Sequence, residues 1–368
     1  MTGVEATLAL EAGLFRLDVT LEAGPGVTVL FGPSGSGKSL TLRAIAGLLR
    51  PRAGRIAVAG RVVFDAARGI DLPAHARGVG YAGQRPALFP HLSVGGNVAF
   101  GIRDAGGADR ARTAAEWLAR LELPGFEHRR PASLSGGQAQ RVALARALAP
   151  GHRVLLLDEP FSALDEALRQ GLRQLLAELV RERELSILFV THDLREAHLL
   201  ADRLAVIDRG EVLQAGPRDE VFRAPRQRRV AELLGGTNIL AGRVVERTGA
   251  GLRLEIEGWE AIAASWHGDP RPGDAVDVVI RPERVVIRRG EPAAVNTLPA
   301  RVRREFDYGT NHTLEFEPLA AGPPLVVDLP SRPYDVLGIA ARKEWTLELP
   351  PADLHVMPAA PPRRATTQ

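Results

Sequence analysis

The sequence predicts an α/β domain followed by a smaller all-β region. Through about residue 234, short apolar runs of strand length alternate with longer stretches of helical periodicity, the pattern of a parallel sheet covered by helices. Beyond residue 237 the chain changes to short alternating segments broken by glycine and proline, which is typical of β-structure. The predicted strands include residues 27–31, 154–157 and 187–190, and the predicted helices include residues 39–49, 108–121, 169–183 and 194–201.

Changes in composition and in apolar periodicity divide the chain into four predicted parts. Residues 1–234 form the α/β domain, and Gly235-Gly236 follows it as a linker. Residues 237–290 and 293–357 form two small β-barrel-like units of the OB type. Residues 358–368 are rich in proline, alanine, arginine and threonine, and this composition predicts a disordered tail.

A faint internal repeat supports the pair of small β units. The segment that begins Asn238-Ile239-Leu240 is echoed by the one that begins Asn296-Thr297-Leu298, and both continue to an Arg-Val pair. Duplication of one β unit explains this echo, and chance similarity between two alternating segments is the alternative. We expect a duplication.

Composition narrows the class of protein. The chain has 368 residues, of which 45% are hydrophobic and 25% charged, as in ordinary globular proteins. It contains no cysteine, which excludes disulfides and cysteine-based zinc sites. The formal net charge is only +3, and the charges of both signs are mixed along the chain. We therefore expect no nucleic-acid partner.

The apolar runs are too short for a membrane span. The N-terminal residues 1–10 lack the basic start and apolar stretch of a signal peptide. The longest apolar runs, at residues 154–157 and 187–190, have the length of a strand. We expect that the chain does not cross a bilayer by itself.

The strongest local motif is a phosphate-binding loop. Residues 32–39 follow the pattern G-x-x-x-x-G-K-[ST] between a predicted strand and a predicted helix, where such a loop must lie. The glycines let backbone N–H groups turn toward phosphates, Lys38 reaches the β- and γ-phosphates of ATP, and Ser39 binds Mg²⁺. The predicted nucleotide-binding residues here are Gly32, Pro33, Ser34, Gly35, Ser36, Gly37, Lys38, Ser39 and Leu40.

Two carboxylates end the apolar strand at 154–157. Asp158 suits the coordination shell of Mg²⁺, and Glu159 suits a base that activates water. A strand that simply ends in polar residues is the alternative explanation. Together with the phosphate loop, the pair predicts a phosphoryl-transfer site.

The pentapeptide Leu134-Ser135-Gly136-Gly137-Gln138 carries a resemblance to a known family. Followed by Gln140-Arg141 and placed before the Asp-Glu strand, it resembles the signature of ABC ATPases. The resemblance implies that residues 135–138 bind nucleotide from a facing subunit. It also implies that Gln84 is the glutamine loop and a Mg²⁺ ligand, that residues 162–165 are the D-loop, and that His192 is the switch histidine.

The same resemblance implies a dimer. In ABC ATPases two nucleotide-binding domains meet head to tail, with each ATP between the phosphate loop of one and the signature of the other. This chain has one set of motifs, so a homodimer is expected, with Glu159, His192 and Gln84 as the catalytic residues. Two positions depart from the family pattern. Gly83 replaces an aromatic before Gln84, and Phe15, upstream of the phosphate loop, has a short spacing for stacking on adenine.

The C-terminal region resembles the regulatory region of importer ATPases. Arg281-Pro282-Glu283, the two Asn-x-Leu repeats and the entry at residues 217–240 carry this resemblance. It implies a translocating ATPase that is peripheral at the cytoplasmic face of the membrane, bound to membrane permease subunits and, through them, to a solute-binding protein.

Several segments of the catalytic domain resemble molybdate importer ATPases. They are residues 61–65, 69–73, 79–81 and 88–94. Pro350-Pro351 stands where molybdate-binding barrels have Lys-Ala, so importers of ferric iron, sulfate, polyamines or sugars are the alternatives. Non-transport ABC ATPases differ further, because they have long coiled-coil inserts or two nucleotide-binding domains in one chain.

Overall fold

The computed structural model describes residues 3–103, 106–290 and 295–359. The chain divides into two compact units after Arg218, and each is described by itself. Residues 360–368, most of the predicted tail, and residues 293–294 of the second predicted barrel unit lie outside the described residues.

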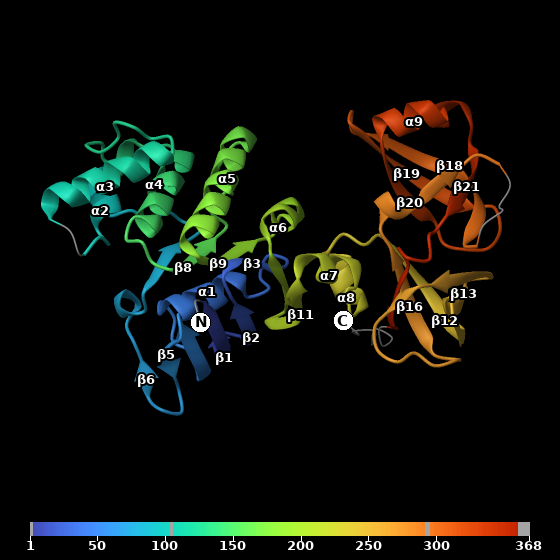
Figure 1. Ribbon diagram of the computed structural model, residues 1–368, viewed down its shortest axis with the longest axis horizontal. Coiled ribbons are helices and arrows are strands. Elements are labelled where there is room, and N and C mark those ends of the chain that lie inside the picture. The colour runs from blue at the N-terminus through green and yellow to red at the C-terminus, as the bar shows by residue number, and fades with distance from the viewer. Residues whose placement is uncertain (1–2, 104–105, 291–294, 360–368) are drawn as a thin grey trace. The chain divides into compact units, whose positions relative to one another are not determined.

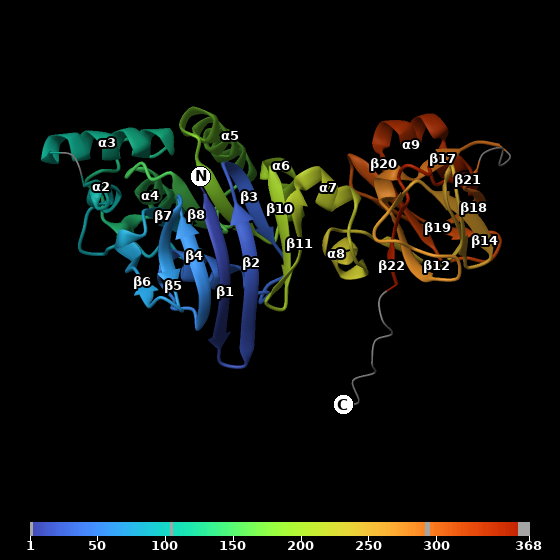
Figure 2. The ribbon, with the colours of Figure 1, turned by 60° about the horizontal axis from the view of Figure 1, so that its bottom comes forward.

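The first unit is built on one mixed sheet (Figure 1). Among the described residues its strands follow the order β6-β5-β4-β1-β2-β11-β10-β3-β9-β8-β7, and the run from β10 through β3, β9 and β8 to β7 is parallel. Figure 2 shows β1 and β2 as a long antiparallel pair beside β4. The strands are β1 (Val4–Ala12), β2 (Phe15–Ala23), β3 (Gly26–Phe31), β4 (Ala53–Val58), β5 (Arg61–Asp65), β6 (Ile70–Asp71), β7 (Val79–Ala82), β8 (Val154–Asp158), β9 (Ser186–Thr191), β10 (Arg203–Asp208) and β11 (Glu211–Pro217).

Helices cover the parallel part of this sheet. Every residue of β3, β8 and β9 is buried, as expected for parallel strands that are covered on both faces. The predicted helical insert between β7 and β8 is present, and it contains α2, α3 and α4. The helices of the unit are α1 (Lys38–Ala46), α2 (Val94–Ala99), α3 (Gly107–Arg120), α4 (Gly136–Leu148), α5 (Glu166–Arg183) and α6 (Leu194–Leu200).

A buried arginine holds the end of α1. Arg77 donates hydrogen bonds to the carbonyls of Ala44 and Ile45 at 2.8 and 3.0 Å, and its guanidinium pairs with Asp71 at 2.9 Å. The last carbonyls of a helix have no partner inside the helix, and a cation is favourable there. Arg77 thus fixes the helix that begins at the phosphate loop.

The second unit consists of two sheets that repeat one pattern. Their strand orders are β14-β13-β12-β16-β22-β15 and β17-β21-β18-β19-β20. β12 and β18 both contain a register shift, after Val244 and after Val302, at equivalent positions of the two repeats. The strands are β12 (Asn238–Thr248), β13 (Gly251–Ile256), β14 (Trp259–Ala263), β15 (Ser265–Trp266), β16 (Ala275–Ile280), β17 (Val286–Arg288), β18 (Thr297–Asp307), β19 (Asn311–Pro318), β20 (Leu325–Pro330), β21 (Glu344–Glu348) and β22 (His355–Pro358).

The two repeats exchange strands across the predicted division at residues 237–290 and 293–357. β17, from the first repeat, pairs with β21 of the second sheet, whereas β22, from the second repeat, pairs with β16 of the first sheet. Buried side chains of both repeats form one hydrophobic cluster. Two separate barrels would leave these edges unpaired, so the repeats form one structural body.

The two repeated asparagines make reciprocal contacts. Asn238 exchanges two hydrogen bonds of 2.7 Å with the backbone of Val326 in the second sheet. Asn296 exchanges two of 2.7 Å with the backbone of Ile262 in the first sheet, and it also donates to Leu349. Both side chains are buried, so these bonds satisfy backbone groups that water does not reach. The reciprocal geometry supports the predicted duplication.

The first unit ends earlier than the predicted boundary at residue 234. Two short helices, α7 (Arg218–Arg223) and α8 (Arg228–Leu233), belong almost entirely to the second unit. Ala231 of α8 packs against Val279 and Met357, and Arg228 pairs with the buried carboxylate of Asp277 at 2.9 Å. This packing places the segment before Gly235-Gly236 with the β region, which the local sequence pattern did not indicate.

A buried histidine makes the second unit sensitive to acid. His355 contacts the Pro225 carbonyl at 3.1 Å and the Ser265 hydroxyl at 2.7 Å. Because the carbonyl only accepts, Nε2 carries the proton and Nδ1 accepts from the hydroxyl. Burial lowers the pKa of His355 to about 4.

We expect the stability of this unit to fall between pH 6.5 and pH 4. In that window the unfolded chain binds a proton at His355 and the folded chain does not, so the contribution is present above pH 6.5 and is lost toward pH 4. The loss reaches about 3 kcal/mol. Urea unfolding followed by the fluorescence of Trp259, Trp266 and Trp345 measures it. The variant His355→Gln should lose this pH dependence, and an unchanged pH dependence in that variant would assign it to another group.

Candidate functional site

The predicted phosphate loop lies between β3 and α1. Gly35 and Gly37 have φ of 80° and 108°, in the left-handed region that glycine adopts without steric cost. A Cβ on Gly37 would lie 2.5 Å from Leu17, and one on Gly32 would lie 2.1 Å from the Ile207 carbonyl. The loop thus needs glycine for conformation and for space. Leu40, predicted as a nucleotide contact, is half-buried and packs against the core of the first unit.

Hydrogen-bond donors are concentrated at this loop. Gly37 is the N-cap of α1 and provides no side-chain cap, so N–H groups of the first turn are available to an anion. Lys38 donates to the carbonyls of Gly32 and Pro33 at 2.7 and 2.8 Å. The hydroxyl of Ser36 is buried and has no hydrogen-bond partner. Burial lowers the pKa of Lys38, while Glu159 and Asp158 oppose that shift. The loop therefore presents a cation and N–H donors to a polyanion.

The residues predicted to bind Mg²⁺ fit a cation. Ser39 donates to Oδ1 of Asp158 at 2.9 Å, while Oδ2 of Asp158 is buried without a partner. Burial raises the pKa of Asp158, and the hydrogen bond from Ser39 opposes this shift. An unpartnered buried carboxylate oxygen beside a hydroxyl is a donor set that Mg²⁺ prefers.

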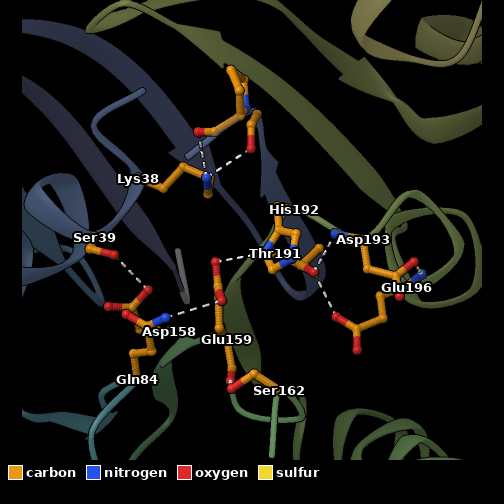
Figure 3. A network of polar contacts seen from close by, with 12 residues as sticks. Lys38, Ser39, Gln84, Asp158, Glu159, Ser162, Thr191, His192, Asp193 and Glu196 are labelled. Atoms are coloured by element: carbon orange, nitrogen blue, oxygen red, sulfur yellow. Dashed lines mark hydrogen bonds and ion pairs between the residues drawn. The ribbon is translucent and has the colours of Figure 1, made fainter. Parts of the chain in front are cut away.

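Glu159 joins two other predicted catalytic residues (Figure 3). Its Oε2 accepts from Nε2 of Gln84 at 3.3 Å, and its Oε1 contacts Nδ1 of His192 at 2.9 Å. Glu159 has φ of 48°, a strained conformation of the kind that persists at functional sites. The structure therefore brings together three residues that are distant in sequence. Gln84 contacts Glu159, and no hydrogen bond links Gln84 to Asp158 in the described residues.

The segment after β9 orients His192. Thr191 donates to the buried Glu196 at 2.6 Å and accepts from the backbone N–H of Asp193 at 3.0 Å. Asp193 in turn caps α6 by accepting from the N–H groups of Arg195 and Glu196. Burial raises the pKa of Glu196, and the Thr191 hydrogen bond opposes it. These contacts fix the turn that carries the imidazole.

The signature residues lie on a different element from the phosphate loop. Ser135 is the N-cap of α4 and forms a capping box with Gln138. A Cβ on Gly137 would lie 3.0 Å from the Ala163 carbonyl of the predicted D-loop. Gly136 has open space where a Cβ would lie. Within the described parts of this one chain, no hydrogen bond links Ser135 or Gln138 to the phosphate loop.

A cavity beside the loop contains residues that sequence reasoning missed. It has a volume of about 380 Å³ and is lined by Phe15 and Arg16, by residues 34–36 of the loop, and by Leu14, Asp208 and Arg209. The ring of Phe15 also lies 3.3 Å from where a Cβ of Gly37 would be. Phe15 begins β2 and lies beside the loop in spite of its short spacing in the sequence. The signal available in the sequence was an aromatic at the start of a strand.

The structure also explains the absence of an aromatic at Gly83. A Cβ there would lie 2.9 Å from the phenolic oxygen of Tyr81. The ring of Tyr81, two residues earlier on the same face of β7, occupies the space beside Gly83. The strand end that leads to Gln84 is therefore packed by a different residue.

Two family models match the chain. The model described as ABC transporter matches residues 14–162, and the model described as TOBE domain matches residues 278–357. Among solved structures, the dimeric structure of a post-hydrolysis state of the ATP-binding cassette MJ0796 bound to ADP and Pi is similar, with a TM-score of 0.52 and 31% identity. That similarity covers 58% of this chain and 98% of the other.

Three curated relatives that are similar to this chain have different substrates in their names. The molybdenum import ATP-binding protein ModC of Paramagnetospirillum magneticum is 46% identical over 222 residues, which are 60% of this chain and 61% of the relative. The spermidine/putrescine import ATP-binding protein PotA 1 of Pseudomonas aeruginosa is 41% identical over 307 residues, 81% of this chain and 80% of the relative. The Fe(3+) ions import ATP-binding protein FbpC 1 of Rhodococcus jostii is 43% identical over 77% of this chain and 78% of the relative.

These matches confirm the predicted fold class, an ABC-type P-loop ATPase domain followed by a β-rich C-terminal region. The relative with 41% identity is matched over four fifths of its length. The chain therefore belongs to the ABC transporter family of ATP-binding proteins, in the group that carries a C-terminal TOBE domain.

Proposed function

We propose that two copies of this chain hydrolyse ATP at sites shared between them. The observation that carries this proposal is that the phosphate loop and Ser135 lie on separate elements without a hydrogen bond between them in the described residues. The similar solved structure is itself described as dimeric and bound to ADP and Pi. A facing copy would bring its Ser135, Gly136 and Gly137 to the γ-phosphate.

Each residue of the site has a defined task in this proposal. Phe15 stacks on adenine, and Lys38 with the loop N–H groups holds the phosphates. Ser39 and Asp158 hold Mg²⁺, which neutralises phosphate charge when bound. Glu159 accepts a proton from the attacking water, and His192 holds the γ-phosphate. Gln84 aligns Glu159 through its amide, in addition to its proposed place near the metal.

We propose that this ATPase acts on a membrane permease. None of the helices in the described part of the chain is long and apolar enough to span a membrane. In this proposal the permease subunits provide the translocation path. We place the chain as a peripheral protein at the cytoplasmic face, with a solute-binding protein contacting the permease. The names of the similar relatives, all import ATP-binding proteins, support this partner.

Molybdate is the substrate that we propose. The support is the 46% identity to a molybdenum import protein and the molybdate-like segments of the catalytic domain. A polyamine is the second candidate, because the polyamine relative is matched over more of this chain, 81% against 60%. The longer match includes the C-terminal region, where the molybdate pattern is incomplete at Pro350-Pro351.

Uptake by cells that lack the gene tests the substrate. We expect such cells to lose molybdenum-enzyme activity at trace molybdate and to regain it at high molybdate, because a second, weaker route then suffices. The wild-type chain should restore activity at trace levels, and the Glu159→Gln chain, matched in size, should not. Normal molybdenum-enzyme activity with a loss of spermidine uptake would assign the polyamine instead.

A further inference from the structure

The segment that follows Gln84 is attached to the helix that begins at the signature. Arg146, near the end of α4, donates from Nη1 to the Ala87 carbonyl and from Nη2 to the Pro86 carbonyl, both at 2.9 Å. Its guanidinium also lies over the ring of Phe89, 5.4 Å from the centroid. A planar guanidinium donates from two separate nitrogens while its face lies over a ring, and the single nitrogen of an ammonium cannot reproduce that arrangement.

A second helix holds the other end of the same segment. Asn97 of α2 is fully buried, accepts from the N–H of Phe89 at 2.7 Å and donates to its carbonyl at 3.1 Å. Ala87, between the two attachments, has φ of 42°, a conformation that a non-glycine residue holds only when its surroundings enforce it. Residues 86–89 are therefore fastened to α2 and α4, and only Arg85 separates them from Gln84.

We propose that Arg146 is a positioning residue that couples the signature helix to Gln84. Ser135 and Arg146 lie on one helix, roughly 16 Å apart along its axis. When Ser135 contacts the ATP that is bound to the facing subunit, α4 moves as a rigid element and carries residues 86–89 with it. Gln84 then moves relative to Glu159, to which it donates at 3.3 Å. The position of Glu159 thereby depends on whether the signature is engaged.

The inference rests on the proposed role of Gln84, and kinetics separate the two. We expect Arg146→Met to lower kcat about 10- to 100-fold, because small misplacement of a catalytic group has effects of this size. KM for ATP should change less than about twofold, since the phosphate loop is untouched. Gln84→Ala should lower kcat as well. Arg146→Met should lower kcat little further in that background, because both changes break the same connection between α4 and Glu159.

Two variants control for a general loosening of α4. Arg141 lies on the same helix and also donates to two carbonyls, those of Leu121 and Glu122, but in the described residues no hydrogen bond links it to residues 86–89. Arg141→Met should lower the melting temperature and, combined with Gln84→Ala, act independently of it. Arg146→Lys keeps the charge, so it should fold and still lower kcat, because one nitrogen on a shorter side chain cannot reproduce the two-nitrogen fork that serves both carbonyls.

Each outcome decides the inference. If Arg146→Met and Arg146→Lys leave kcat unchanged, Arg146 only stabilises the fold. If Arg146→Met lowers kcat by the same factor with and without Gln84→Ala, it acts by another route. An unchanged kcat in Gln84→Ala overturns the role of Gln84 and the coupling together, while ATP hydrolysis by the wild-type chain stays established in the same assay.

Discussion

Replacing Glu159 with glutamine is expected to lower ATP turnover by about a hundredfold or more while ATP binding persists. Glutamine keeps the size and the hydrogen bonding of Glu159, but it has no carboxylate to accept a proton from water. The proposed contacts of Lys38 with the phosphates, and of Ser39 and Asp158 with Mg²⁺, do not depend on that carboxylate. Because hydrolysis would normally separate the two subunits, the ATP-bound dimer should accumulate.

Size-exclusion chromatography with Mg-ATP measures this dimer. Glu159→Gln should give a dimer peak that is smaller or absent when Ser135→Arg is added, since an arginine at the N-cap of α4 obstructs the facing phosphates. Parallel runs with ADP identify any dimer that the TOBE region maintains without ATP. A Glu159→Gln protein that hydrolyses ATP at the wild-type rate would place the base elsewhere.

Replacing Lys38 with alanine is expected to reduce kcat/KM for ATP by about a hundredfold to a thousandfold. The ammonium group of Lys38 is held over the phosphate loop by hydrogen bonds to the carbonyls of Gly32 and Pro33. Its loss leaves the N–H donors of the loop without the positive charge that we propose meets the β- and γ-phosphates. The fold should persist, because those two carbonyls lie at the site, where water can replace the ammonium.

Lys343 is a matched control, since it is the other lysine of the sequence and its side chain is exposed in the second unit. Lys343→Ala should bind and hydrolyse ATP as the wild-type chain does. Binding of a fluorescent ATP analogue and steady-state kinetics measure both variants. Wild-type ATPase activity of Lys38→Ala with Mg²⁺ present would remove this loop from the site.

Much of the site was predictable because its motifs are local. The phosphate loop is a run of neighbouring residues whose glycines and strand–loop–helix setting specify its conformation, and the structure places it between β3 and α1. Asp158 and Glu159 follow a buried strand, and Ser135 begins a helix with its own capping box. In each case the residues that set the local backbone conformation lie within a few positions of sequence, so the motif can be found there even though its contacts with other motifs cannot.

Phe15 and the C-terminal unit were not predictable in the same way. β1 and β2 form a local hairpin across Gly13 and Leu14, but the position of Phe15 beside the loop depends on how β2 joins the sheet next to β11, which no local spacing encodes. The strand exchange of β17 and β22 likewise joins residues that are far apart in the chain. A repeat in sequence predicts two similar folds, but it does not say whether each closes on itself or on the other.

The sequence by itself determined the ATPase fold and the family, and it predicted the residues that we propose meet phosphate, because short segments with one backbone conformation carry them. Only the tertiary structure decided how these residues act on one another. The contacts of Glu159 with Gln84 and His192, and of Arg146 with residues 86–87, arise where separate strands and helices meet. Such contacts depend on how helices pack and strands pair, and packing is a property of the whole folded unit.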